Sequence, residues 1–237
     1  LSSQKNINTE QKTARTKIAT SAFYDCTGVT GVVIPESVDE IGYNAFKDCS
    51  RLKEIKIDSL KAWCHINFRE NPLMLNSKPS LIVNGDPIEN DLVIPDGVEM
   101  IGGSAFRGLP ITSVLIPSSV LTISTRAFSD CSNLTNVIFE NGCRTIGDYA
   151  FYACGSLNSV VLPESLVSVG DYAFYYAGTV GDLTFNSPTD LTVGTFGFGG
   201  ATVTVGAATF VVTIVGLPTV APIWTVGRET FIETDEK

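Results

Sequence analysis

The sequence predicts a strand-rich solenoid, a fold in which successive coils of the chain stack along one axis. Three observations lead to this prediction: a dipeptide recurs at a nearly constant spacing, each period holds a short β-rich segment, and proline or glycine separates the segments. A fixed period of about 20 to 50 residues indicates a stacked array of repeats. With 44% hydrophobic residues, the chain of 237 residues can bury a continuous core.

The dipeptide Ala-Phe marks the repeat. It occurs as Ala22-Phe23, Ala45-Phe46, Ala105-Phe106, Ala127-Phe128, Ala150-Phe151 and Ala173-Phe174. The last four copies are separated by 22, 23 and 23 residues. Aligned on these pairs, the coil reads Leu-x-x-Val-x-Ile-Pro-x-Ser-Val-x-x-Ile-Gly-x-x-Ala-Phe-x-x-Cys. We expect the Phe residues, and the Ile or Val five residues before each, to form the core, contributing about 2–3 kcal/mol apiece by burial.

Each period also holds a short segment rich in Val, Ile and Leu. These segments are residues 32–34, 114–116, 137–139 and 160–162. We expect them to stack as neighbouring strands of one parallel sheet. A proline follows most of them and ends the strand, because it cannot donate to the hydrogen-bond ladder. The recurring glycine predicts a tight corner where a positive φ is favoured, although Ser124 fills that slot in one coil. The glycines of this slot are Gly42, Gly102, Gly147 and Gly170.

These residues resemble the BspA-like leucine-rich repeats of bacterial and protozoan surface proteins. The match to the pattern Ile-Pro-x-Ser-Val-x-x-Ile-Gly-x-x-Ala-Phe-x-x-Cys covers most of residues 18–185. The resemblance implies a right-handed leucine-rich-repeat solenoid of α/β type, rich in strands, with a parallel sheet and irregular caps. It also implies a secreted or cell-surface protein that takes part in adhesion and binds host or matrix proteins. It implies no catalytic residues.

The period fails inside residues 58–90. The strand landmarks Ile57 and Ile94 lie 37 residues apart, so one coil carries an insertion. Residues 81–85 followed by 91–93 read as strand, turn and strand, which predicts a hairpin-like excursion.

The ends of the chain depart from the repeat as well. We expect residues 1–17 to be a flexible segment, residues 18–185 to be the solenoid, and residues 186–237 to be a degenerate repeat and a β-rich C-terminal cap, with Thr195-Phe196 as a last echo of Ala-Phe. A solenoid needs terminal coils that seal its core, so we favour a cap. The alternative is an exposed edge that joins another domain or copy.

Composition argues against nucleic-acid and membrane functions. The net charge is −9, and the sixteen basic residues are scattered, whereas binding to a polyphosphate requires clustered Lys and Arg. The uncharged stretch between Asp190 and Arg228 contains many Thr and Gly residues and two prolines, so strands fit it better than a membrane-spanning helix. No signal peptide is visible, but the first residue is Leu and not Met, so we expect that an export signal has been removed and that the protein lies outside the cell or on its surface.

The cysteines and the histidine could carry chemistry. Cys26, Cys49, Cys131 and Cys154 all lie three residues after Phe, which indicates a buried ladder, with a disulfide between adjacent coils as the alternative. His65 is the only histidine and follows Cys64. We expect both on a strand, where adjacent side chains point to opposite faces, and His65 to be partly buried and structural.

Nothing else in the sequence indicates catalysis. Asp148 and Asp171 share one slot on neighbouring coils, which resembles a glycosidase pair or a calcium site, but solvated charges are the favoured interpretation. No Cys-x-x-Cys pair occurs, so a zinc site has almost no support. We expect no metal, no cofactor and no enzymatic activity.

Two surfaces are candidates for binding. The first is the outward strand position, occupied by Val33, Lys56, Val93, Leu115, Ile138, Val161 and Thr184. Its aliphatic character indicates a binding groove, unless flanking side chains or another domain cover it. The second is an aromatic patch around Phe151 and Phe174, made of Tyr149, Tyr152, Tyr172, Tyr175 and Tyr176. Such tyrosines serve protein or sugar recognition, or they shield the core with their hydroxyls in water.

The sequence therefore favours a non-catalytic module for protein binding or adhesion, with a host or matrix protein as ligand. One alternative is a glycan-binding module. Another is a structural spacer or assembly unit joined through the C-terminal strands.

Overall fold

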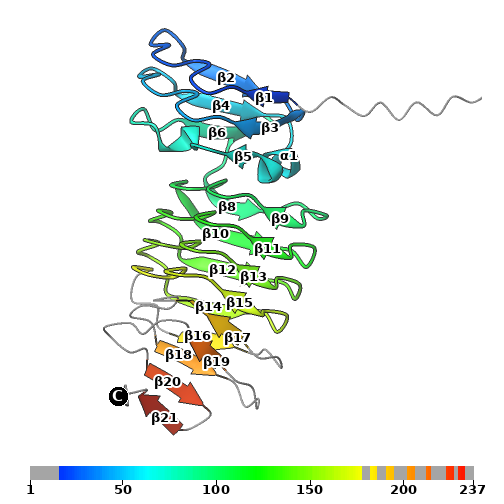
Figure 1. Cartoon of the computed structure of the whole chain (residues 1–237), viewed down its shortest axis with the longest axis vertical. Helices are drawn as coiled ribbons and strands as arrows, with labels where there is room; N and C mark the ends of the chain where they lie inside the picture. The colour runs from blue at the N-terminus through cyan, green and yellow to red at the C-terminus, as the bar shows by residue number, and fades with distance from the viewer. Residues whose placement is uncertain are drawn as a thin grey trace, which may run out of the picture.

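The computed structural model describes residues 16–177 together with the strands at 182–185, 191–194, 202–205, 212–214, 223–226 and 229–232. The coils stack along the long axis of the molecule, as Figure 1 shows. The fold is the predicted strand-rich parallel solenoid, and its helical content is small. Residues 1–15, most of the expected N-terminal segment, lie outside the described residues, and so does Thr195-Phe196. Thr16 and Lys17 belong to the first strand.

The segments expected to form one parallel sheet are divided between two sheets, and further strands of the described chain form two more. Each regular coil contributes two strands, one before its proline and one after it. Proline ends the first strand, and the Val-x-x-Ile segment that follows forms a second, shorter strand that pairs with its equivalents in neighbouring coils. The sequence interpretation recognised only the first.

The first strands form two separate sheets. The four-stranded sheet has the order β2 (Gly31–Ile34), β4 (Glu54–Ile57), β6 (Ser80–Val83) and β7 (Asp86–Pro87). The eight-stranded sheet begins with β8 (Asn90–Val93), β10 (Ile111–Ile116), β12 (Asn136–Phe139) and β14 (Ser159–Leu162). It continues with β16 (Asp182–Phe185), β18 (Thr202–Val205), β20 (Ile223–Val226) and β21 (Glu229–Ile232), and β21 pairs antiparallel to β20.

The second strands form the other two sheets. The three-stranded sheet consists of β1 (Thr16–Ile18), β3 (Val38–Ile41) and β5 (Asn67–Phe68). The six-stranded sheet consists of β9 (Met100–Ile101), β11 (Thr122–Ile123), β13 (Thr145–Ile146), β15 (Ser168–Val169), β17 (Leu191–Val193) and β19 (Val212–Ile214). The core lies between the two series of strands and the turns that hold the Ala-Phe pairs.

The core contains the predicted stack of Phe side chains. Ring centroids lie 5.4 Å apart from Phe106 to Phe128, 5.3 Å from Phe128 to Phe151 and 5.1 Å from Phe151 to Phe174, and these four rings are fully buried. Phe23 also stacks, on Phe46 at 5.2 Å, but it is 39% exposed because it lies in the first described coil. The register read from the Ala-Phe spacing is confirmed.

The expected role of the recurring glycine is wrong in one respect. None of the glycines of this slot has a positive φ; among the described glycines only Gly85, Gly97 and Gly108 have one. The slot favours glycine because the preceding coil passes close to it in most coils. A Cβ at Gly147 would lie 2.8 Å from the Thr125 nitrogen, and a Cβ at Gly102 would lie 2.7 Å from the Cys64 oxygen. Close backbone approach, and not backbone conformation, selects the residue here.

The positive φ values occur elsewhere in the turn, at residues two positions before and two positions after the Phe, and all of these are non-glycine residues except Gly108. Around Phe128 these residues are Arg126 (φ 58°) and Asp130 (φ 63°). This conformation directs three alternate N–H groups toward the next coil. Those of Arg126, Phe128 and Asp130 donate to main-chain oxygens of the next coil at 2.9, 2.8 and 2.8 Å. We call this pattern the turn ladder, and it also links the coils of Phe23, Phe106 and Phe151 to their successors.

The irregular coil, residues 58–90, departs from this pattern. Residues 60–65 form a short helix, α1 (Leu60–His65), with the Ser59 side chain capping its N-terminus, and a single 3₁₀ turn, η1 (Pro72–Met74), follows. The predicted turn lies at Asn84 and Gly85, which both have a positive φ, and it joins β6 to β7 in an antiparallel hairpin. The segment expected as the second strand of the hairpin, residues 91–93, belongs instead to β8 and pairs in parallel with β10.

Side chains of the irregular coil replace the missing part of the turn ladder. The indole Nε1 of Trp63 donates at 2.8 Å to the Ala105 oxygen, which is a ladder acceptor, and the Asn71 amide adds a bond to the Ser104 oxygen, which is not one. On the other side, the N–H of Asn44 donates to Glu70 Oε2 at 2.6 Å. The irregular coil therefore joins two regular stacks through side-chain hydrogen bonds.

Candidate functional site

The first candidate surface is an aliphatic strip on the outer face of the eight-stranded sheet. It consists of Val93, Leu115, Ile138 and Val161, and we call it the sheet strip. Leu115 pairs with Val93 on one side and with Ile138 on the other, and Val161 pairs with Thr184 of β16. Val93, Ile138 and Val161 are 58%, 48% and 57% exposed, and Leu115 is partly buried. These exposed fractions mean that flanking side chains of the described residues leave the strip open.

The strip is bordered by polar residues. Asp91, Ser113 and Asn136 lie two residues before its members on β8, β10 and β12, so they project from the same face. The Ser113 hydroxyl donates to Asp91 Oδ1 at 2.6 Å. The surface is therefore a narrow apolar band beside a hydrogen-bonding one.

The predicted column is shorter than expected, because Val33 and Lys56 do not belong to it. They lie in the four-stranded sheet, where Lys56 pairs with Val33 and Ile82. Lys56 is in an ion pair with Glu54 at 2.9 Å. The insertion in the irregular coil separates the two sheets, so the column breaks between Ile82 and Val93.

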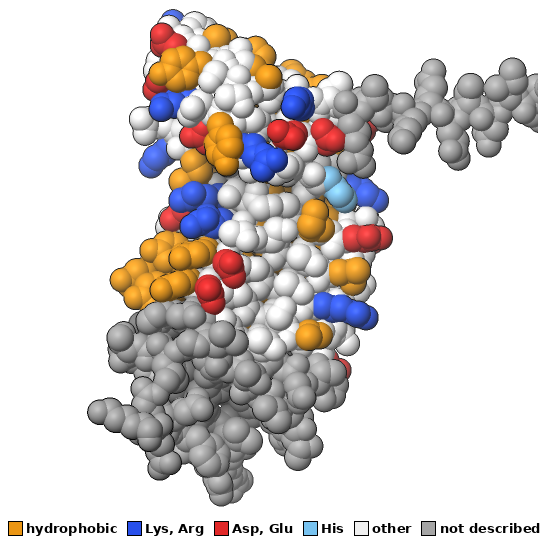
Figure 2. Space-filling view, viewed as in Figure 1, with side chains coloured by type: hydrophobic (Ala, Val, Ile, Leu, Met, Phe, Trp, Pro, Cys, Tyr) orange, Lys and Arg blue, Asp and Glu red, His pale blue; other side chains and the backbone are white. Residues whose placement is uncertain are grey.

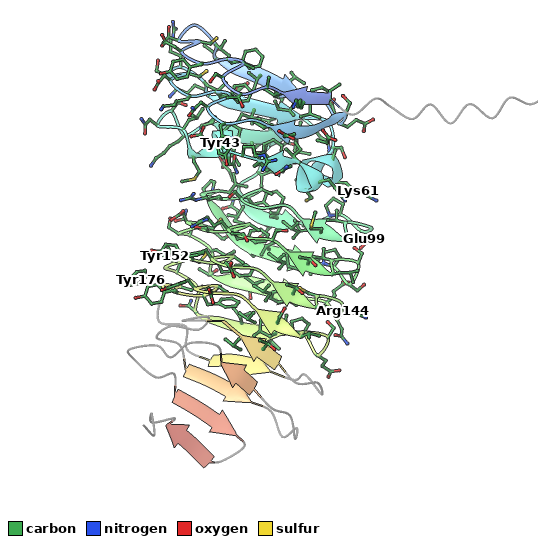
Figure 3. The ribbon with its side chains drawn as sticks, in the orientation of Figure 1. Tyr43, Lys61, Glu99, Arg144, Tyr152 and Tyr176 are labelled. Carbon is green, nitrogen blue, oxygen red and sulfur yellow. The ribbon has the colours of Figure 1, made fainter. Side chains whose placement is uncertain are left out.

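The second candidate surface is the tyrosine cluster, which consists of Tyr149, Tyr152, Tyr172, Tyr175 and Tyr176. Ring centroids lie 5.0 Å apart in the stacked pair Tyr149–Tyr172 and 6.2 Å apart in the stacked pair Tyr152–Tyr175. Figure 2 shows hydrophobic side chains gathered on the side of the molecule where Figure 3 labels Tyr152 and Tyr176, with basic side chains close by. The structure thus brings these tyrosines together on the turn side of two adjacent coils.

The cluster is held by backbone geometry and by local contacts. Tyr149, Tyr172 and Tyr176 occupy turn positions with φ values of 57°, 56° and 55°, which are uncommon for residues with a large side chain. A hydrogen bond with Tyr176 raises the pKa of the Tyr175 hydroxyl. Tyr176 is 63% exposed, whereas the other four are partly buried, so Tyr176 presents most of the free aromatic surface.

One neighbour of the cluster was not identified from the sequence. The Arg126 guanidinium lies 4.5 Å from the centroid of the Tyr149 ring, in cation–π geometry. The available signal was its position, because Arg126 fills in one coil the slot that Tyr149 and Tyr172 fill in the next two. The cluster therefore combines ring faces, hydroxyl groups and one cation.

The cysteines form the predicted ladder. All six are free thiols; Cys49, Cys131 and Cys154 are buried, and Cys26 is partly exposed. The Cys131 thiol donates to the Phe106 oxygen at 3.1 Å, and the Cys154 thiol donates to the Phe128 oxygen at 3.2 Å. Burial raises the pKa of Cys131 to about 12 and raises the pKa of Cys154 well above its ordinary value. Thiols of this kind are poor nucleophiles.

The expected placement of Cys64 and His65 is wrong, because both lie on α1 and not on a strand. Cys64 is buried, with its pKa raised by burial to about 12. His65 is exposed, and its Nδ1 lies 2.7 Å from the Lys61 oxygen. Propensity favoured a strand for this apolar segment, but the Ser59 cap and the packing of Trp63 produce a short helix.

The two carboxylates suggested by the repeat have a structural contact. Asp148 Oδ1 accepts a hydrogen bond of 2.9 Å from the main-chain nitrogen of Asp171. Across the part of the chain that the structure describes, no group of three or more His, Cys, Asp or Glu side chains has an arrangement suited to a metal ion. Within the same residues, no helix has the length and apolar character needed to cross a membrane.

Comparison with known proteins identifies the repeat. A sequence profile of the BspA type leucine rich repeat region matches residues 2–72 and 86–198, in six copies. None of the curated proteins compared with the chain matches it.

Solved structures of leucine-rich repeat proteins are similar to the chain. A leucine-rich repeat protein from Bacteroides ovatus is 22% identical, with a TM-score of 0.47, over 89% of this chain and 66% of that one. The leucine rich repeat protein of T. pallidum is 21% identical, with a TM-score of 0.38, over 86% and 68%. A leucine rich cell surface protein from Faecalibacterium prausnitzii is 19% identical, with a TM-score of 0.32, over 72% and 83%.

Proposed function

The chain belongs to the family of BspA type leucine-rich repeat proteins, and from this premise we propose that it is a non-catalytic module for protein binding and adhesion. Its ligand is a host or matrix protein, and its place is outside the cell or on the cell surface. Repeats of this family specify a framework, so recognition depends on the side chains that each chain carries on the framework's surface.

The observation that supports this proposal is the exposure of the sheet strip. Val93, Ile138 and Val161 keep about half of their surface or more in contact with water although they lie on β8, β12 and β14 of one sheet. A ligand that covers aliphatic side chains arranged in this way gains about 25 cal/mol of binding free energy for each Å² of apolar surface removed from water. Strands spaced about 4.8 Å apart make the strip continuous along the solenoid axis.

The chemistry of the sheet strip favours a protein over a glycan. Its four members have no hydrogen-bonding side chains, whereas a sugar exposes hydroxyl groups that need donors and acceptors. A protein ligand can place apolar side chains on the strip and polar ones on the row formed by Asp91, Ser113 and Asn136. Interfaces of this kind have an apolar centre and a polar rim.

The proposal is tested by changing Leu115, Ile138 and Val161 together to Ser. The ligand is a purified matrix protein that the unchanged chain binds in an immobilised panel. We expect the variant to fold and to bind this protein at least about tenfold more weakly, a loss of about 1.4 kcal/mol of binding free energy. Binding isotherms measure the loss, and a circular dichroism melt establishes folding. A folded variant that binds with unchanged affinity would show that recognition lies elsewhere.

A matched control uses the turn side of the same coils. Changing Tyr176 to Ser removes an exposed aromatic side chain outside the sheet strip. If protein binding depends on the strip, Tyr176→Ser leaves the affinity unchanged. If the Tyr176 variant loses affinity and the strip variant does not, the tyrosine cluster is the protein site.

Glycan binding through the tyrosine cluster is the second candidate function. It is favoured by the exposed Tyr176 ring, which can stack on a sugar face, and by Arg126, which can pair with an acidic sugar. A glycan array with the unchanged chain and with Tyr176→Ser tests it. Loss of every glycan signal in the Tyr176 variant supports this function, and the absence of any signal with the unchanged chain excludes it for the glycans on the array.

A further inference from the structure

The turn ladder is interrupted where the coil of Phe46 meets the irregular coil. Among the described residues, the main-chain N–H groups of Phe46 and Asp48 have no hydrogen-bond partner. The equivalent groups of Phe128 and Asp130 donate to the next coil. A main-chain donor without a partner lowers stability unless water or a ligand accepts its hydrogen bond.

The reason for the interruption lies in the irregular coil. Its chain forms η1 and a loop at the place where a regular coil would present three main-chain oxygens. Glu70 supplies a carboxylate oxygen to Asn44, the first of the three donors, at 2.6 Å. The second and third donors, at Phe46 and Asp48, have no such substitute in the irregular coil.

A cavity of about 450 Å³ lies at the third of these donors. Its walls come from the coils of Phe23 and Phe46 and from the loop that follows η1. The loop contributes Leu75 and Ser77, and Ser77 Oγ is buried without a hydrogen-bond partner. The wall that the loop contributes therefore has an unsatisfied polar group.

The charge of the cavity is predominantly negative. Asp25, Asp48 and Glu70 line it together with one basic residue, Lys47. The carboxylate of Glu70 is already engaged by the N–H of Asn44. Asp25 and Asp48 fill the same repeat slot on adjacent coils, with φ values of 56° and 63°, so their side chains project from equivalent turns.

We propose that this gap in the turn ladder binds an extended peptide segment that carries a lysine or arginine side chain. The peptide would lie in the cavity between the turn of Phe46 and the loop that follows η1, with carbonyl oxygens accepting from Asp48, which lines the cavity, and from Phe46, two residues before it. Carbonyl groups on one edge of an extended chain recur every two residues, as do the donors at Phe46 and Asp48. The basic side chain lies between Asp25 and Asp48.

This mode of binding adds an extended segment to the turn ladder at the point where the fold leaves it incomplete. Main-chain hydrogen bonds supply affinity for the peptide backbone, and the two carboxylates select for positive charge. A metal ion is a poorer occupant, because the described acidic residues have no arrangement suited to one. The inference is independent of the sheet strip, which lies on the eight-stranded sheet and not in the turns.

The test uses amide hydrogen exchange of the full chain measured by NMR. Without a ligand, we expect the amides of Phe46 and Asp48 to exchange at least about tenfold faster than those of Phe128 and Asp130, which hold the same repeat slots. Adding the peptide acetyl-Thr-Lys-Thr-Lys-Thr-amide should slow Phe46 and Asp48 and leave the other two unchanged. The peptide acetyl-Thr-Glu-Thr-Glu-Thr-amide should have no effect.

Variants test the contribution of the carboxylates. Changing Asp25 and Asp48 to Asn keeps a side chain that tolerates a positive φ and removes both charges. We expect the lysine peptide to bind this variant about fivefold more weakly, as for exposed ion pairs. Changing the exposed residues Asp58 and Asp96 to Asn removes the same charge elsewhere and should leave binding unchanged.

Three outcomes would overturn the proposal. In the first, the lysine peptide at its solubility limit does not slow amide exchange at Phe46 and Asp48. In the second, the glutamate peptide slows exchange at both residues as much as the lysine peptide does. In the third, both amides exchange slowly in the free protein, which would show that the gap is already occupied. The occupant is a second copy of the chain if exchange becomes slower as the protein concentration increases, and the chain itself if it does not. The triple Ser variant of the sheet strip should bind the lysine peptide normally, which separates this inference from the proposed function.

Discussion

The indole nitrogen of Trp63 donates a hydrogen bond of 2.8 Å to the main-chain oxygen of Ala105, which lies 42 residues further along the chain. Both residues are buried. In regular coils the oxygen before the Phe accepts from a main-chain N–H of the preceding coil, as Ala127 accepts from Phe106. Trp63 therefore performs with a side chain what a regular coil performs with its backbone.

Replacing Trp63 by Phe should lower the free energy of unfolding by about 1–3 kcal/mol through the hydrogen bond, because the buried Ala105 oxygen loses its donor. The smaller ring adds a cavity contribution of similar size. Urea unfolding measures the total. Indole N–H exchange in the unchanged chain provides the control, and rapid exchange of the Trp63 indole proton would contradict the assignment.

Position along the Phe stack should determine the effect of truncation. Phe151→Ala should lower the free energy of unfolding by about 3–5 kcal/mol, because its ring is fully buried between Phe128 and Phe174. Phe23→Ala should have a clearly smaller effect, since Phe23 is 39% exposed and has a stacking partner on one side. Denaturant melts of the two variants provide the comparison, and equal losses would be inconsistent with the observed stack.

The glycine slot offers a matched pair of substitutions. Gly147→Ala should destabilise the chain by about 1–3 kcal/mol, because the new Cβ would meet the backbone of Ser124 and Thr125. The closest of these contacts is 2.8 Å, to the Thr125 nitrogen. Gly155→Ala should be nearly neutral, since a Cβ there would have nothing within 4 Å. Thermal melts of both variants distinguish close approach from a general effect of alanine.

The thiol ladder should resist alkylation. At pH 8 a thiol with the ordinary pKa of 9.0 has an appreciable thiolate fraction, whereas the pKa of about 12 at Cys131 leaves almost none. Burial raises this pKa only in the folded chain. Increasing the pH to 10 should therefore accelerate labelling of Cys131 far more in unfolded chains than in folded ones. Mass spectrometry after iodoacetamide treatment measures both rates. Rapid native labelling of Cys131, or a peptide crosslinked from Cys131 to Cys154, would contradict the ladder.

The regular part of the fold was predictable because each coil repeats the same local constraints. Ala-Phe spacing located the stacked rings, and the segments around Val114, Val137 and Val160 were correctly predicted as parallel strands. The second strand of each coil was missed because it is short. Its formation depends on pairing with the adjacent coils more than on its own propensity, as the two-residue strand at Thr122 and Ile123 illustrates.

The irregular coil was much less predictable. Its boundaries followed from the failed period, but the helix around Trp63 depends on tertiary contacts, including the hydrogen bond to Ala105. The same is true of Glu70 and Asn71, whose roles arise only when the turns of adjacent coils come next to them. The membership of the tyrosine cluster was readable from the repeat, whereas the cation–π contact of Arg126 required the geometry of the turn.

The side-chain hydrogen bonds of the irregular coil also determine which coils can be duplicated without losing contacts between neighbours. A tandem duplication of a regular coil, such as the one that contains Phe128, inserts a unit whose donors and oxygens match those of both neighbours. A duplication of residues 58–90 places Trp63 and Asn71 against a second irregular coil, which has no oxygens equivalent to those of Ala105 and Ser104. An added regular coil therefore preserves the hydrogen bonds between coils, whereas a second irregular coil would lose the bonds that Trp63 and Asn71 make to Ala105 and Ser104.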